Sequence, residues 1–333
     1  MTDTSPNQSQ HQPLNSQAML VASRALSAAR PAIISLLINS SAELSSGVAH
    51  PISFCNVLFV GNFSAALLVG FWFGFSKILN DFQKLKPAVK VGLILNGSLA
   101  TLLSTLIFLG LQETSVTNAV LLGRLGPVLF ALVGAIALKK RISRLEWVGF
   151  SLIAVGVVTI ALKTSQYRVS RGDMLILLST LVFATSALIN HLMIARAAAL
   201  HVVVFSRNIL SASIFFVIAM KLFGPHHFAD TFSGHLWVIM AIYALIVIVF
   251  AQFLWYSAIN QLDSRIIGRL TVLSPVFGVT YAFLLNGEQP SSTQLGTLLL
   301  IIVGVLIASM SSGSRNPRME MLAKDTENVA SVP

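Results

Sequence analysis

The run SVTNAVLLGRLGPVLFALVGAIAL, residues 115–138, determines the fold class that we expect for this chain. It holds a single charged side chain, Arg124. Its length matches the roughly 17–25 apolar residues that a helix needs to cross about 30 Å of hydrocarbon. We therefore interpret it as a transmembrane helix.

The composition of the whole chain agrees with a lipid environment. Of its 333 residues, 55% are hydrophobic and only 10% are charged, and the mean hydropathy is +0.80. Soluble domains carry about 25% charged residues, so a water-facing surface cannot be built from this sequence. Open sheet edges do not survive in lipid. We therefore predict an all-α, polytopic membrane protein.

Similar apolar runs recur on both sides of this stretch, and we predict about ten transmembrane helices. A polar segment, 1–31, should precede them, disordered at first and amphipathic from residue 19, and a disordered tail should follow at 311–333. The predicted helices lie at approximately 32–48, 53–75, 88–110, 115–138, 145–162, 174–194, 202–222, 235–258, 264–286 and 293–310.

The distribution of Lys and Arg predicts the orientation, because cytoplasmic loops carry an excess of both. With a cytoplasmic N-terminus, fifteen of them, including Arg24 and Arg30, flank helices on the cytoplasmic side and four flank the far side. We therefore predict a multi-pass protein of the plasma or inner membrane with both termini in the cytoplasm. This placement also accounts for the net charge of +10 without a nucleic-acid partner, which would require basic residues clustered on a polar surface.

The two halves of the apolar region, 32–163 and 172–310, resemble each other. FVGN at 59–62 is followed 146 residues later by FSRN, and LGPV at 125–128 is followed 148 residues later by LSPV. Five helices per half is an odd number, so the second copy must enter the membrane from the opposite side. Such inverted repeats are typical of secondary transporters with a binding site at the repeat interface.

The pattern around the fourth helix of each half carries a family resemblance. Small and hydroxyl residues lead to Pro127, a basic exit follows, and the next helix contains Gly149; the second half offers Pro275 and Gly296 in the same order. In this pattern the chain resembles the EamA-type, ten-helix branch of the drug/metabolite transporter superfamily.

The resemblance covers roughly residues 32–310 and implies a central cavity. Helices one, three, four, six, eight and nine should line that cavity, while helices five and ten should be peripheral. Members of the family usually carry a glutamate at the exit of each fourth helix. Glu288 matches this position, whereas Lys140 occupies it in the first half.

Ionisable groups inside predicted helices are the strongest candidates for a substrate site, because burying one at mid-bilayer costs roughly 2.5–3.5 kcal/mol. Arg124 lies about 13 Å deep at about 1.5 Å per residue, and two interpretations remain open: it binds an anionic substrate group, or it pairs with Glu43. Glu43 itself could exchange protons during transport, could be that structural partner, or could be solvated at the outer end of helix one.

Further polar residues could complete the site. Arg207 and Arg269 lie near the ends of their helices and could also reach the interface. The neutral candidates are as compatible with interhelical hydrogen bonds as with ligand contacts; they are Asn96, Asn190, Gln252 and Tyr256. Four tryptophans near helix ends should act as interfacial anchors: Trp72, Trp147, Trp237 and Trp255.

The sequence contains no Walker A loop, no His-Glu-x-x-His pair and no Gly-x-Ser-x-Gly elbow. We therefore expect no enzyme, no catalytic residues, no metal and no cofactor. The leading hypothesis is a secondary carrier or exporter of a small polar metabolite, amino-acid-like or an organic anion, working by alternating access. The alternative is a membrane sensor or scaffold that retains the fold without transport. As a transporter, the protein would have the solute and the lipid bilayer as partners, and the sequence leaves open whether it forms a homodimer.

Overall fold

The computed structural model describes residues 11–40, 54–137, 142–163, 169–194, 197–222, 224, 234–259, 261–262 and 264–311. Throughout these residues the regular elements are helices, and no strand occurs among them. Within the same residues, nine helices are long and apolar enough to cross a membrane, and a bent pair brings the number to as many as ten. The predicted polytopic all-α fold is confirmed.

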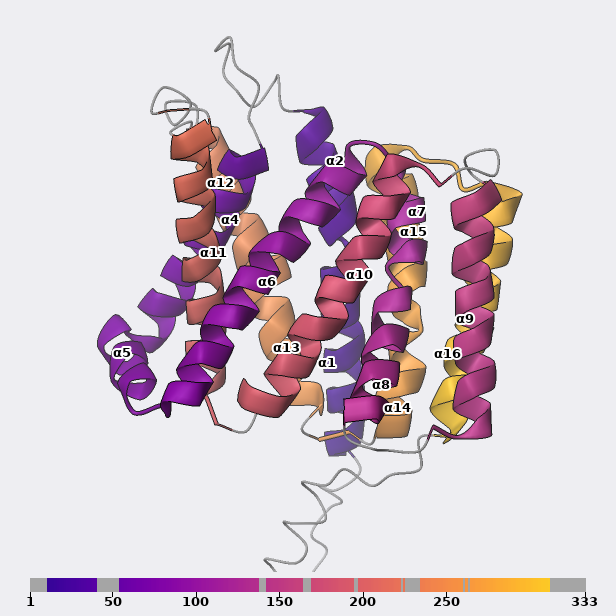
Figure 1. Ribbon diagram of the computed structural model, residues 1–333, viewed down its shortest axis with the longest axis horizontal. Coiled ribbons are helices and arrows are strands. Elements are labelled where there is room, and N and C mark those ends of the chain that lie inside the picture. Colours follow the sequence, from indigo (N-terminus) through magenta and orange to yellow (C-terminus); the bar gives the residue numbers. More distant parts are fainter. Residues whose placement is uncertain are drawn as a thin grey trace, which may run out of the picture.

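The first five spans are built from eight helices (Figure 1). Spans one, two and four are each divided in two, and spans three and five are single helices. In order they are α1 (His11–Ala28) with α2 (Arg30–Asn39), α4 (Phe54–Phe73) with α5 (Phe75–Gln83), α6 (Pro87–Leu111), α7 (Val116–Leu122) with α8 (Leu125–Ala137), and α9 (Arg144–Lys163).

The second five spans follow the same order. Span nine is divided like span four, and spans six and eight contain π-helical turns. They are α10 (Arg171–Ile189) with η1 (Asn190–Ile194), α11 (Leu200–Leu222), α12 (Gly234–Tyr243) with η4 (Ala244–Phe250) and α13 (Ala251–Ile259), α14 (Ser264–Thr271) with α15 (Leu273–Asn286), and α16 (Ser292–Ser311).

The first span corrects two expectations. The structure places it at Asn15–Asn39, whereas the sequence had suggested 32–48 after a disordered and amphipathic segment. Arg24 and Arg30 therefore lie inside a span and do not flank one. Both guanidinium groups have partners from span eight, because Arg24 stacks on the Trp255 ring and Arg30 interacts with the Tyr243 hydroxyl.

The spans alternate in direction through the bundle (Figure 1). α1 begins and α16 ends at the same end of the molecule, which we call the terminal end; the other is the far end. The first repeat starts at the terminal end with α1, and the second starts at the far end with α10. This opposite entry is the inverted arrangement that the odd number of spans per half predicts.

Helix packing repeats the same two-fold relationship. The equivalent helices α4 and α11 pack on each other, as do α9 and α16. α6 packs on α10 in the same way that its equivalent α13 packs on α1. Likewise, α8 packs on α10, and its equivalent α15 packs on α1. α9 and α16 lie together at one edge of the bundle (Figure 1), which leaves the broken spans four and nine facing the interior.

Candidate functional site

Span four breaks at Arg124. α7 ends at Leu122, and α8 begins at Leu125 after a turn in which the Arg124 amide donates to the Leu121 carbonyl at 3.1 Å. Pro127 contributes to the break, because it has no amide hydrogen to donate to the carbonyl four residues earlier. Span nine breaks at the equivalent place, between Thr271 and Leu273. The breaks place irregular backbone in the bundle, which is tolerated where it lines a cavity.

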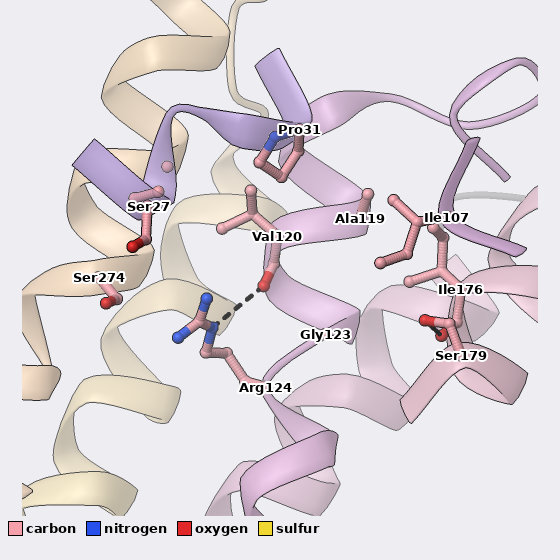
Figure 2. Close-up of a pocket in the computed structure, with 12 residues that line it drawn as sticks. Ser27, Pro31, Ile107, Ala119, Val120, Gly123, Arg124, Ile176, Ser179 and Ser274 are labelled. Carbon is pink, nitrogen blue, oxygen red and sulfur yellow. Dashed lines mark hydrogen bonds between the residues drawn. The ribbon is translucent and has the colours of Figure 1, made fainter. Parts of the chain in front are cut away.

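The Arg124 side chain extends from this break toward the second repeat. Its Nε donates to the Val120 carbonyl at 3.3 Å. Its two terminal nitrogens are directed toward Ser27 and Ser274 (Figure 2), and no hydrogen bond to them occurs among the residues that the structure describes. The guanidinium thus keeps donors available on its cavity side.

Two adjoining hollows surround Arg124, of about 150 and 220 Å³. They share the residues Ser27, Ala28, Gly123, Arg124 and Ser274. The first hollow extends between spans three and six to Ile107, Ile176 and Ser179, and the second reaches Arg24, Pro127 and Phe183. Their lining comes from spans one, three, four, six and nine, five of the six that the family resemblance implied.

Arg24 is the second cation of this cavity. Its guanidinium carbon lies 3.8 Å from the centre of the Trp255 ring, a cation–π geometry. A terminal nitrogen donates to Ser23 Oγ at 3.3 Å, while Nε is buried without a hydrogen-bond partner. Ser23 in turn donates to the Ala251 carbonyl at 2.7 Å, so α1 is held against α13. Trp255, which the sequence suggests as an interfacial anchor, packs against Arg24 in the structure.

The cavity carries an excess of positive charge. Arg24 experiences like-charge interactions with both Arg124 and Arg30. Among the described residues, no Asp or Glu side chain lies within 4 Å of any of these three arginines; the acid–base pairs found there are Lys84–Asp81, Arg171–Glu113 and His201–Asp81. An unpaired buried charge costs several kcal/mol, so the site favours an anion as its occupant.

The other predicted site residues have different surroundings. Asn96 is buried, and its amide nitrogen donates to the Ser186 carbonyl at 3.1 Å and to its Oγ at 3.2 Å, a bond between α6 and α10. Arg269 is exposed on α14. Neither residue lines the two hollows, and the hydrogen-bonding interpretation fits Asn96 best.

The remaining candidates do not line these hollows either. Arg207 on α11, Asn190 in η1 and Gln252 on α13 are half-buried. The side chain of Tyr256 and the whole of Glu43 lie outside what the structure describes, so the roles considered for Glu43 stay predictions.

Sequence reasoning missed Arg24, Ser27 and Ser274. The charge pattern predicts Arg24 to be a flanking residue, because the sequence suggests a later start for the first span. A window beginning at Asn15 contains only the two charges Arg24 and Arg30 in 25 residues, and it would have revealed the earlier span. The serines carry no such signal, since similar hydroxyls occur on most of the spans.

The described residues contain no group of three or more His, Cys, Asp or Glu side chains that could hold a metal ion. The polar groups that converge on the cavity are guanidinium and hydroxyl donors. Such an arrangement can bind oxygen atoms of carboxylate or phosphate groups and orient them.

Comparisons with known proteins agree with this architecture. The EamA-like transporter family matches the chain twice, over residues 32–162 and 170–310. An uncharacterized transporter of Synechocystis sp. is 30% identical over 272 residues, which cover 77% of this chain and 76% of that protein. The uncharacterized transporter YetK of Bacillus subtilis is 24% identical over 212 residues, or 62% of this chain and 63% of its own length.

Likeness also extends to a solved structure. One crystal structure superposes with a TM-score of 0.54 at 16% identity, covering 86% of this chain and 98% of that one. At this identity the match speaks for the fold alone.

Proposed function

This chain belongs to the EamA-like transporter family, and from that premise we propose that it carries a small organic anion across the membrane by alternating access. The family and the names of the relatives point to a transporter and not to an enzyme. The observation that supports an anionic substrate is Arg124, whose terminal nitrogens face a cavity without a carboxylate partner among the described residues.

Alternating access requires that the cavity be closed at one end while it opens at the other. At the far end, several bonds join the first repeat to the second. Thr114 Oγ1 donates to Asp173 at 2.6 Å, Arg171 pairs with Glu113 at 3.6 Å, and Gln294 donates to Asn118 at 2.7 Å. Glu288 adds bonds to Val116 and Thr117. These bonds support a state whose far end is closed.

The breaks in spans four and nine supply the places at which the helices can bend. The half-helices of the two broken spans also pack on each other, because α15 contacts α7. We place the cytoplasm at the terminal end. Without Arg24 and Arg30, thirteen of the fifteen counted Lys and Arg residues still flank spans on that side, against four on the other.

Uptake measurements in proteoliposomes test this function. A panel of labelled small carboxylates and phosphate esters is offered to liposomes that contain the wild-type chain, Arg124→Gln, or Arg269→Gln as the matched control. We expect uptake of at least one anion by the wild type and the control, and loss of that uptake in Arg124→Gln with unchanged insertion and thermal unfolding. The proposal of an anionic substrate would be rejected if only neutral solutes were taken up, or if Arg124→Gln took up the anion as fast as the wild type. Absence of any transport would favour the sensor or scaffold.

A further inference from the structure

We propose that the cavity binds a substrate with two separate acidic groups, one held by Arg124 and the other by Arg24. This inference rests on the proposed function and makes its substrate class specific. It assigns Arg24 a role as the residue that selects a dianion over a monoanion.

The count of charges is the first argument. Arg24 and Arg124 line the same hollow and interact as like charges. A monoanion would neutralise one of them and leave the other uncompensated. A buried charge without a partner is strongly destabilising. Two negative charges balance both guanidinium groups.

The third arginine does not compete for this role. Arg30 interacts with the hydroxyl of Tyr243, and it lines neither hollow. Arg24 and Arg124 are the arginines that line the second hollow, and they come from different spans. Because the two guanidinium groups reach the hollow from different spans, two acidic groups on one substrate fit them better than two charges on one group.

Both guanidinium groups are held in place yet retain donors. The face of Trp255 and the Ser23 hydroxyl fix the tip of Arg24, and its Nε is buried without a partner. A buried polar atom without a hydrogen bond is rare in proteins, and Nε of Arg30 is a second one on the same span. Arg124 is anchored through Nε and keeps its terminal nitrogens for the cavity. Each guanidinium can donate to a carboxylate, and Arg124 can do so with both terminal nitrogens as a bidentate partner.

The space between the two arginines suits a short acid. The hollows measure about 150 and 220 Å³, and an apolar cavity of about 150 Å³ holds a benzene molecule. Ser27 and Ser274 line both hollows, so their hydroxyls can bond a polar substituent between the acidic groups. The fitting class is a dicarboxylate with a chain of a few carbons, with or without a hydroxyl or keto group.

Ligand-dependent thermal unfolding of the full chain in detergent tests the proposal. The probes are malonate, succinate, glutarate and adipate at constant ionic strength. Monomethyl succinate serves as the monoanion, succinamide as the neutral analogue, and methyl phosphate as the ligand with both charges on one group. We expect one dicarboxylate to bind the wild type about tenfold or more tightly than monomethyl succinate, the effect of one additional charged hydrogen-bonded group.

Variants separate this proposal from the function on which it rests. Arg24→Gln should erase the preference for the dicarboxylate while monomethyl succinate still binds; Arg24→Lys should retain part of it, and Arg269→Gln all of it. Arg124→Gln should lose both ligands. Equal binding of dicarboxylate and monoanion by the wild type, tighter binding of methyl phosphate, or a preference that survives Arg24→Gln would overturn the dianion site alone. If no acid binds and Arg124→Gln changes nothing, the proposed function fails with it.

Discussion

The carboxylate of Glu288 accepts two hydrogen bonds from Thr117, one from the backbone amide at 2.9 Å and one from the hydroxyl at 2.8 Å. Its other oxygen accepts the amide of Val116 at 2.6 Å. The left-handed turn at Gly287, with φ of 67°, reverses the chain after α15 and brings Glu288 to the start of α7. A carboxylate from the second repeat thus caps a helix of the first.

Loss of this cap should destabilise the protein. We expect Glu288→Ala to lower the free energy of unfolding by about 1–2 kcal/mol, because capping side chains contribute about that much and the negative charge also interacts favourably with the helix dipole. Glu288→Gln should have a smaller effect. Denaturant unfolding in mixed micelles measures both. The adjacent exposed Gln289→Ala is the control, and an effect as large as that of Glu288→Ala would contradict the cap.

The crossing of α9 and α16 should be sensitive to a single methyl group. A Cβ at Gly149 would lie 2.4 Å from the Gly304 carbonyl oxygen, and one at Gly304 would lie 2.8 Å from that of Gly149. We expect either alanine substitution to cost about 1–3 kcal/mol through overpacking. Gly296→Ala, on the same α16 and with no atom within 4 Å of its Cβ, is the matched control. It should be neutral or stabilising, since alanine favours helix.

Much of the architecture could be predicted because membrane-length apolar runs and repeat offsets are properties of the sequence itself. Pro127 and Pro275, which lie 148 residues apart, are each the third residue of the second half-helix of a broken span. The same offset of 148 residues pairs Arg124 with Val272, not with Arg269. Gly-Arg-Leu occurs in both halves, at 123–125 and 268–270, but this match does not place its two arginines at equivalent positions of the repeats.

The start of the first span was predicted wrongly for a physical reason. Arg24 and Arg30 resemble flanking charges as long as their partners, the Trp255 ring and the Tyr243 hydroxyl, are unknown. Both partners belong to span eight, more than 200 residues later, and only the tertiary fold brings them together. The cavity hydroxyls likewise follow from packing and not from any local pattern.

The orientation of the chain can be tested by labelling single cysteines. In a Cys55→Ala background, Val169→Cys at the far end and Gln83→Cys at the terminal end both place an exposed thiol. A membrane-impermeant maleimide should label Val169→Cys in intact cells and Gln83→Cys only after permeabilisation, since basic flanks face the cytoplasm. A reporter fused after Pro333 should agree with Gln83→Cys. The reverse pattern would invert our topology.

The uncompensated arginines also predict the mode of transport. To change sides, the cavity must pass through a state closed at both ends, in which Arg24 and Arg124 lose contact with bulk water. Without an anion that state is costly, so the empty carrier should return slowly and the protein should act as an exchanger. Each 1.36 kcal/mol added to the barrier of the empty carrier slows its return about tenfold.

Exchange is measured with the dicarboxylate that stabilises the protein most. Proteoliposomes preloaded with the unlabelled acid should take up the labelled acid at least about tenfold faster than empty ones. An increase of about 1.36 kcal/mol in the barrier for return of the empty carrier corresponds to this factor. Arg24→Gln removes one of the two charges from the empty cavity. Preloading should therefore accelerate the uptake of monomethyl succinate by this variant. The factor should be smaller than the factor by which preloading accelerates the uptake of the dicarboxylate by the wild type. Equal uptake by empty and preloaded liposomes in the wild type would rule out obligatory exchange and would show that the empty cavity closes readily despite its charge.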